Sequence, residues 1–257
     1  MREKHLVIST YNFDPTYLTQ IGIPFTIYDQ SDQEYFQRKV SGFENVFSRP
    51  NVGHSLSNIF EYITENYDSL PDLVIFVKSN VLPRHCTKDY FHQNIENNYF
   101  THLFHLDSVQ VDKRHSDYLA PGFFMEVNDS WYAQTKNHKL FCGFNQFYKF
   151  LFANNQVPKF LVFSPGACYI VESERIRNYP KSFWQALDFI SSYQFFPMEA
   201  YMVERALSMI FSSKLILQPW VNDSDSWKKM LVSQLNSDAQ HTCMPSIKER
   251  IVKRFLP

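Results

Sequence analysis

Residues 51–80 (NVGHSLSNIFEYITENYDSLPDLVIFVKSN) constrain the fold most strongly, because an amphipathic helix is followed at once by a buried strand. The apolar residues of the first part recur at the three-and-four spacing of one helical face: Leu56, Ile59, Phe60 and Ile63. Pro71 ends this pattern, since proline cannot occupy a helix interior. Residues 73–77 then form a continuous apolar run, which is typical of a strand covered on both faces. Together the two segments predict an α/β fold.

The predicted strand is followed by three polar residues, Lys78, Ser79 and Asn80. In open α/β sheets, ligands bind beyond the carboxyl ends of the strands. This triplet is therefore the first candidate for a binding site.

Apolar runs and turn residues predict further elements along the chain. Strands are expected at residues 5–10, 25–28, 43–47, 101–106 and 123–127, and on both sides of residues 164–166 within 159–171. Helices are expected at residues 88–97, 144–152, 181–190 and 198–211, with Thr87 capping the first and Pro197 opening the last. Strands that alternate with helices favour a mainly parallel, doubly wound sheet flanked by helices. The chain has no internal repeat and no low-complexity linker, so one domain is expected.

Composition argues against several classes of protein. The formal net charge is -1, which gives no general field for nucleic acid or an anionic membrane. No apolar run reaches membrane-spanning length, and the N-terminus enters a strand-like run directly, so neither a transmembrane segment nor a cleaved signal peptide is expected. The four cysteines form no CxxC pair, which favours buried, reduced thiols and a cytoplasmic location.

Aromatic residues make up 17% of the chain, which favours an aromatic core, and only six residues are glycine. With so few glycines, we expect Gly53 and Gly166 to hold backbone conformations that other residues avoid. The motifs GxxxxGK[ST], GxGxxG, GxSxG and HExxH are absent. The sequence therefore gives no support to a P-loop protein, a Rossmann dehydrogenase, an α/β-hydrolase or a zincin.

Glu199 is a candidate on chemical grounds, because it falls within the apolar stripe of the helix predicted at 198–211. A carboxylate on a buried face is unfavourable unless it is paired or hydrogen bonded, and its place in the first helical turn offsets part of that cost. Two interpretations stay open. Glu199 accepts backbone N–H groups at the helix start or pairs with an arginine, or it is a catalytic base at the mouth of a cleft.

Several spaced blocks, in order, resemble a known family. Asn51-Val52-Gly53, then Asn58 and an apolar strand, are similar to the nucleotide-sugar half of GT-A glycosyltransferases. A closer resemblance, to glycosyltransferase-like proteins of fungi and bacteria that are often described as domains of unknown function, extends over most of residues 5–212. Its later blocks are GACYIV at residues 166–171, Ile176, and EAYMVER at residues 199–205.

The resemblance implies a single GT-A-like, Rossmann-like domain with a nucleotide-sugar half at about 1–120, an acceptor half at about 121–215 and a C-terminal helical tail at about 216–257. It also implies which residues face the nucleotide sugar: Thr10, Tyr11, Asn12, Asp29, Asn51, Gly53, His54, Lys78, Ser79 and Asn80. The acceptor side has Gly166, Ala167 and Glu204. Glu199 matches the position of the base that deprotonates an acceptor hydroxyl in inverting members.

One departure from the family concerns the metal. The DxD metal ligands of the family would follow the strand, where this chain has Lys78-Ser79-Asn80. A literal DxD at Asp223-Ser224-Asp225 lies in the polar C-terminal region instead of at a strand end. The departing nucleoside diphosphate still needs its charge neutralised. Lys78 could do this, supported by Arg84 or His85. Alternatively, Asp107 or Asp112 could hold Mn²⁺ or Mg²⁺. The metal ligands therefore stay unknown at this point.

Three functions follow as hypotheses. The first is an inverting transferase that moves a sugar from a nucleotide sugar, with UDP-sugars favoured, to a saccharide acceptor. The second is a catalytically inactive carbohydrate- or nucleotide-binding module on the same fold. A nucleotidyltransferase ranks third, because such enzymes normally need paired acidic metal ligands.

Overall fold

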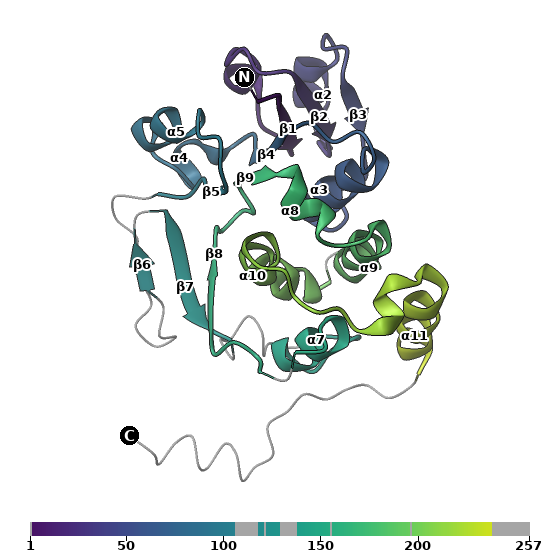
Figure 1. Cartoon of the computed structure of the whole chain (residues 1–257). Coiled ribbons are helices and arrows are strands. Elements are labelled where there is room, and N and C mark those ends of the chain that lie inside the picture. The colour runs from purple at the N-terminus through teal and green to yellow at the C-terminus, as the bar shows by residue number, and fades with distance from the viewer. Residues whose placement is uncertain are drawn as a thin grey trace, which may run out of the picture.

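The computed structural model describes residues 2–105, 118–120, 122–128, 138–154, 156–195 and 197–237. Its main element is a six-stranded mixed sheet in the order β3-β2-β1-β4-β9-β5 (Figure 1). The strands are β1 (Lys4–Thr10), β2 (Phe25–Asp29), β3 (Val46–Ser48), β4 (Leu73–Lys78), β5 (Thr101–His102) and β9 (Tyr169–Glu172). The protein is therefore an α/β protein, as the sequence predicts.

Four neighbouring strands of this sheet, β3, β2, β1 and β4, are parallel. Their pairing places Thr10 beside Asp29 and Ser9 beside Lys78, so the polar residues that end these strands lie along one edge. Strand β9 runs antiparallel to β4, and β5 runs antiparallel to β9. The expected parallel arrangement is thus limited to β1–β4, and the sheet as a whole is mixed.

A second, antiparallel sheet has the order β6-β7-β8, with β6 (Tyr118–Ala120), β7 (Phe123–Val127) and β8 (Phe160–Phe163). Figure 1 shows it below the six-stranded sheet, beside α10 (Glu199–Ser212). The two strand-like runs within residues 159–171 are β8 and β9, which belong to different sheets. The turn between them therefore connects the two sheets.

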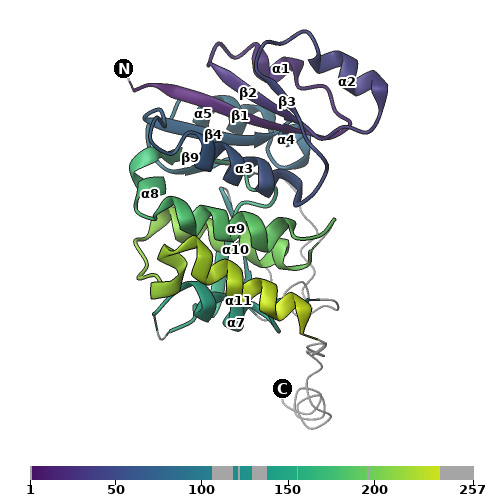
Figure 2. The same cartoon turned by 90° about the vertical axis from the view of Figure 1, so that its right-hand side faces the viewer.

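The remaining helices are α1 (Thr16–Thr19), α2 (Glu34–Val40), α3 (His54–Glu65), α4 (Val81–Arg84), α5 (Lys88–Asn94), α7 (Phe144–Leu151), α8 (Ser173–Arg177), α9 (Lys181–Ser192) and α11 (Ser224–Asn236), with a short 3₁₀ helix at Pro219–Asn222. Of these, α3, α5, α7 and α9 correspond to predicted segments and α11 lies within the expected C-terminal helical tail, whereas the sequence does not predict the others. Figure 2 shows α9 between α3, which covers the sheet, and α11. Among the described residues, none of the helices combines the length and the apolar character that crossing a membrane requires.

Several boundaries differ from expectation, and the helix predicted at 88–97 ends at Asn94. The third strand begins at Val46 and not at residue 43, because Phe43 N donates a turn hydrogen bond to the Val40 carbonyl at 3.0 Å at the end of α2. The predicted strand at 101–106 shortens to two residues. Helix α10 begins at Glu199 after an N-cap at Met198, so Pro197 precedes the helix. The predicted cap of α5 is confirmed, since the Thr87 hydroxyl accepts a hydrogen bond from Tyr90 N at 3.3 Å.

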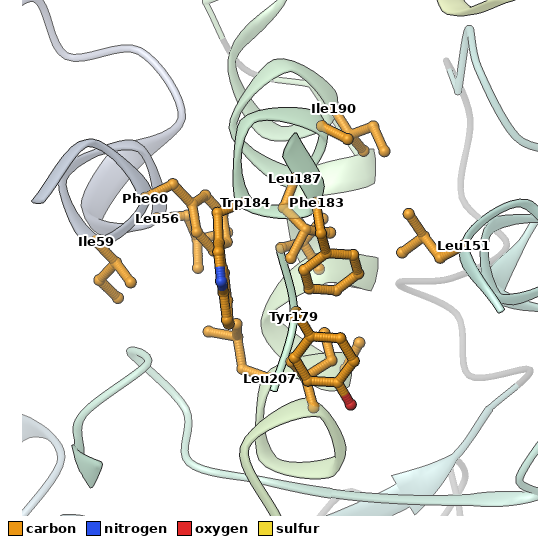
Figure 3. Packing of buried hydrophobic residues seen from close by; sticks show 14 of the residues in the cluster. Leu56, Ile59, Phe60, Leu151, Tyr179, Phe183, Trp184, Leu187, Ile190 and Leu207 are labelled. Carbon is orange, nitrogen blue, oxygen red and sulfur yellow. The ribbon is translucent and has the colours of Figure 1, made fainter. Parts of the chain in front are cut away.

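Both faces of β4 are covered, which explains its continuous apolar run. Leu73, Ile75 and Val77 belong to one buried cluster, and Val74 and Phe76 belong to another. The second cluster contains the apolar face of α3 and most of the buried aromatic rings. At its centre Trp184 lies beside Phe60 and Phe183, at ring distances of 6.1 and 5.2 Å (Figure 3). The aromatic core expected from composition is therefore confirmed.

Candidate functional site

The candidate site lies where the order of the parallel strands reverses. The chain builds β1, β2 and β3 in one direction and then places β4 on the other side of β1. In open α/β sheets, the crevice beyond the carboxyl ends of the strands at such a switch point is the usual ligand site. Thr10 ends β1 and Lys78 ends β4, so both lie at this crevice.

The loop after β1 presents a fixed aromatic ring. Tyr11 is 46% exposed, and its hydroxyl donates a hydrogen bond to Asp32 Oδ2 at 3.0 Å. Asn12 has a positive φ of 49° and donates from Nδ2 to Asp32 Oδ1 at 2.6 Å. The hydrogen bond to Asp32 raises the pKa of Tyr11, while one with the Asn51 side chain lowers it. Asp32 was not singled out from the sequence, although its position shortly after β2 could have suggested it.

The end of β2 fixes the backbone that leads into α3. Asp29 is buried, and its Oδ1 accepts a hydrogen bond from Ser31 N at 3.0 Å. The neighbouring Gln30 donates to the carbonyl of His54 at 3.2 Å and accepts from Asn58 Nδ2 at 3.1 Å. Asp29 and Gln30 therefore fix the backbone that connects the end of β2 with the start of α3.

The start of α3 points its backbone N–H groups toward this edge. Gly53 is the N-cap, with φ +68°, and no side chain caps the helix. The first helical residue, His54, has a lowered pKa, caused by burial and then by the positive charge of Lys78. Lys78 thus lies within electrostatic reach of the helix N-terminus.

Lys78 makes no ion pair with the carboxylates of the described residues. A lysine and a helix N-terminus both favour a negative charge. Ser79 continues the chain with its N–H donated to the Ser9 carbonyl at 2.9 Å, and Asn80 is the N-cap of α4. Lys78, Ser79 and Asn80 therefore connect β4 to α4, and the Lys78 ammonium pairs with no carboxylate in the described part of the chain.

His85 lies within electrostatic reach of Lys78. Its side chain is nine-tenths buried, and a Cβ built on Gly166 would lie 2.8 Å from its Nε2. Burial, followed by the charges of Lys78 and Arg84, lowers the pKa of His85 to about 3, so the ring is neutral at physiological pH. Within the described part of the chain, its Nε2 has no hydrogen-bond partner. A ligand that enters the crevice could supply one.

The acceptor-side candidates meet at the turn between β8 and β9. Gly166 and Ala167 both have positive φ values, 87° and 57°. Gly166 N donates to Glu204 Oε1 on α10 at 2.8 Å. The turn therefore brings Lys78, His85, Gly166 and Glu204 into one neighbourhood, although these residues are far apart in the sequence.

Glu199 has a different environment. It is 0% exposed, and its Oε1 accepts hydrogen bonds from Lys139 N at 2.8 Å and Leu140 N at 2.7 Å. Its Oε2 accepts one from the Tyr193 hydroxyl at 2.8 Å. Glu199 thus accepts backbone N–H groups, but they belong to residues 139 and 140 and not to the start of its own helix, as one interpretation of the sequence expected. None of its hydrogen-bond partners belongs to the crevice.

The metal ligands considered from the sequence remain unassigned. The described residues contain no group of three or more His, Cys, Asp or Glu side chains that could hold a metal ion. Asp223 is the N-cap of α11 and accepts a hydrogen bond from Ser226 N at 3.0 Å, which gives the literal DxD a capping role. Asp107 and Asp112 lie outside the described residues.

Cysteines 86, 142 and 168 are free thiols. Cys86 and Cys168 are fully buried, and burial raises their pKa values to about 12 and about 11. These two thiols therefore stay protonated and unreactive, as expected for small buried side chains. Cys243 lies outside the described residues.

A family model described as Protein of unknown function (DUF3431) matches residues 26–224, which is most of the chain. The protein therefore belongs to this family. The matched region runs from β2 to the start of α11, so it includes Lys78, His85, Gly166 and Glu204 but not the loop after β1. No curated protein and no solved structure matches the chain significantly.

Proposed function

We propose that this protein is a glycosyltransferase that moves a sugar from a nucleotide-sugar donor, a UDP-sugar by preference, to a saccharide acceptor with inversion. The proposal rests above all on Lys78, a cationic side chain without a carboxylate partner in the described part of the chain, near the uncapped N-terminus of α3. This pairing suits the diphosphate of a nucleotide sugar, because both groups stabilise negative charge.

The other residues of the edge fit parts of the same ligand. The fixed and exposed ring of Tyr11 offers a flat surface for a nucleobase, and Asn12, Asp32 and Asn51 surround it with polar groups. In this arrangement Lys78 neutralises the charge that develops on the departing diphosphate, in the role that a metal ion takes in other members of the GT-A class. Asn80 follows at the N-cap of α4, whereas Ser79 is buried and supports the end of β4 from within.

The strand order of the sheet and the state of the cysteines also support the proposal. The parallel strands β3-β2-β1-β4, with a switch point between β1 and β4, are compatible with a GT-A-like nucleotide-sugar half. The free thiols of Cys86, Cys142 and Cys168 are in keeping with a reducing compartment, and we place the activity in the cytoplasm on that ground.

One observation favours an alternative, a catalytically inactive module that binds nucleotides or carbohydrates. Glu199, which the family resemblance implies as the base, has both carboxylate oxygens occupied by hydrogen-bond donors. A carboxylate held in this way stabilises the structure without being presented to a substrate. The two functions share the binding site and differ in turnover.

A binding experiment tests the part that both functions share. The melting temperature is measured with UDP, GDP, ADP and CDP and with the corresponding nucleotide sugars, each with and without EDTA. A nucleotide that binds only the folded protein raises the melting temperature. We expect UDP to do so, with the shift retained in EDTA. Loss of the shift in EDTA would assign the diphosphate charge to a metal site instead of Lys78.

The variant Lys78→Ala is expected to weaken UDP binding by about 10- to 100-fold, since a charge-assisted contact is worth about 1.5–3 kcal/mol. Lys149→Ala is the matched control, because it removes the same charge from an exposed position on α7. Its affinity should equal that of the wild-type protein. No response to any nucleotide, or equal binding by the two variants, contradicts the proposed site.

A further inference from the structure

We propose that Glu204, and not Glu199, is the carboxylate that takes the proton from the acceptor. This inference rests on the proposed glycosyltransferase function and names a different residue for its central step. The two glutamates lie on the same helix, α10, but their surroundings differ in exposure, in hydrogen bonding and in distance from the candidate crevice.

A catalytic base needs an oxygen that can reach the substrate. Glu199 offers none, because it is fully buried and three donors occupy its two oxygens. The side chain of Glu204 is 19% exposed. Among the described residues, Gly166 N donates a hydrogen bond to its Oε1, and Arg205 Nη1 forms an ion pair with its Oε2 at 3.7 Å. Glu204 Oε2 is therefore the oxygen that can accept a further proton.

The location of Glu204 also fits the reaction. It contacts the β8–β9 turn at Gly166, and His85 packs against the same glycine. The charges of Lys78 and Glu204 both act on the thiol of Cys168, one lowering and the other raising its pKa, so both groups lie near that residue. A cation for the leaving group and a carboxylate for the acceptor thus border one crevice.

Two features hold Glu204 in position. Gly166 and Ala167 adopt the left-handed conformation that directs Gly166 N toward Glu204. The adjacent Arg205 forms its closer ion pair with Glu126 on β7, and both of these side chains are buried, while its Nη1 lies 3.7 Å from Glu204 Oε2. Since Glu126 already neutralises Arg205, Glu204 keeps its capacity to accept a proton from a substrate.

The proposed reaction is a single displacement at the anomeric carbon of the donor sugar. Glu204 Oε2 takes the proton of an acceptor hydroxyl, and the oxygen of that hydroxyl forms a bond with the anomeric carbon of the donor sugar. The bond between that carbon and the diphosphate oxygen breaks, and its electron pair leaves with the nucleoside diphosphate. Lys78 stabilises the leaving charge. Glu204 then releases the proton to solvent.

The test measures release of nucleoside diphosphate from a panel of UDP- and GDP-sugars, with water as the acceptor, by the wild-type protein and three variants. We expect Glu204→Gln to lower kcat by at least about 100-fold, which is the size of a general-base contribution. Its KM for the donor and its affinity for UDP should stay within about threefold of the wild type. The amide oxygen of the new side chain can still accept the Gly166 N–H, so the fold should be retained, as a melting curve will show.

Two further variants separate a chemical role from a structural one. Glu204→Asp should restore part of the rate, and the acidic limb of the pH profile of kcat should be lost only in Glu204→Gln. Glu199→Gln should melt at a lower temperature and keep the rate of the wild type per folded molecule. If Glu204→Gln turns over at the wild-type rate, or if only Glu199→Gln is inactive, the assignment is wrong. UDP binding without turnover of any donor by the wild type also overturns it, whereas a lack of UDP binding refutes the proposed function itself.

Discussion

The Cα atom of Gly53 faces the carbonyl oxygen of Ser191 so closely that a Cβ built on the glycine would lie 2.8 Å from that oxygen. The N-terminus of α3 is thereby packed directly on the end of α9, and the φ of +68° at Gly53 makes the turn into α3 possible. The glycine expected to line the nucleotide site thus has a clear structural role. It sets where the N–H groups of α3 point.

The variant Gly53→Ala should therefore destabilise the protein for two reasons, the positive φ and the contact with Ser191. We expect a loss of about 2–4 kcal/mol in the free energy of unfolding, measured with urea. Gly22→Ala is the control, because Gly22 has a similar φ of +86° and a Cβ built on it would meet no atom within 4 Å. It should lose about 1 kcal/mol. Equal losses would mean that the contact with Ser191 is easily relieved.

The raised pKa of Asp188 predicts how the free energy of unfolding depends on pH. Burial, followed by the charge of Glu61, raises its pKa to about 7, against an ordinary value of 3.8. Between these two values the folded protein binds the proton more tightly than the unfolded chain does. The contribution of Asp188 to stability is therefore greatest below about pH 4 and is lost as the pH rises to about 7.

Replacing the carboxyl group by an amide should remove this dependence. Relative to the wild type, Asp188→Asn should gain about 2–4 kcal/mol in the free energy of unfolding between pH 4 and pH 8. Asp68→Asn removes the same charge from an exposed turn and should show no such gain. Parallel stability–pH curves for Asp188→Asn and the wild type would show that Asp188 is ionised in the folded protein at acidic pH.

The Arg205–Glu126 pair connects α10 to β7 and is buried on both sides. Removing one partner takes away the closest opposite charge from a buried ionised group, so Arg205→Met or Glu126→Gln should each destabilise the protein by about 3–5 kcal/mol. The double variant should be less destabilised than the sum of the two, with a coupling of at least about 2 kcal/mol in a double-mutant cycle. Arg38→Met, which breaks an exposed pair with Glu34, should lose no more than about 1 kcal/mol. Additive losses would show that the buried pair is not coupled.

The N-terminal half of the fold could be predicted from the sequence because its signals are local. The helical spacing in α3, the break at Pro71 and the apolar run of β4 are each contained within a few turns of chain. The position of Lys78 at the end of a buried strand follows from the same run. Burial of Glu199 could also be inferred, since helical periodicity places it on the apolar stripe.

The sequence could not show which partners these residues meet. Strand β9 inserts antiparallel between β4 and β5, and no local pattern specifies such a pairing between segments that are far apart in the chain. The same reason applies to Glu199, whose donors lie at residues 139, 140 and 193. Periodicity determines which face of an element is buried, whereas tertiary packing decides what lies against it. Lys78, His85, Gly166 and Glu204 are therefore recognisable one by one in the sequence, and only the fold brings them to one crevice.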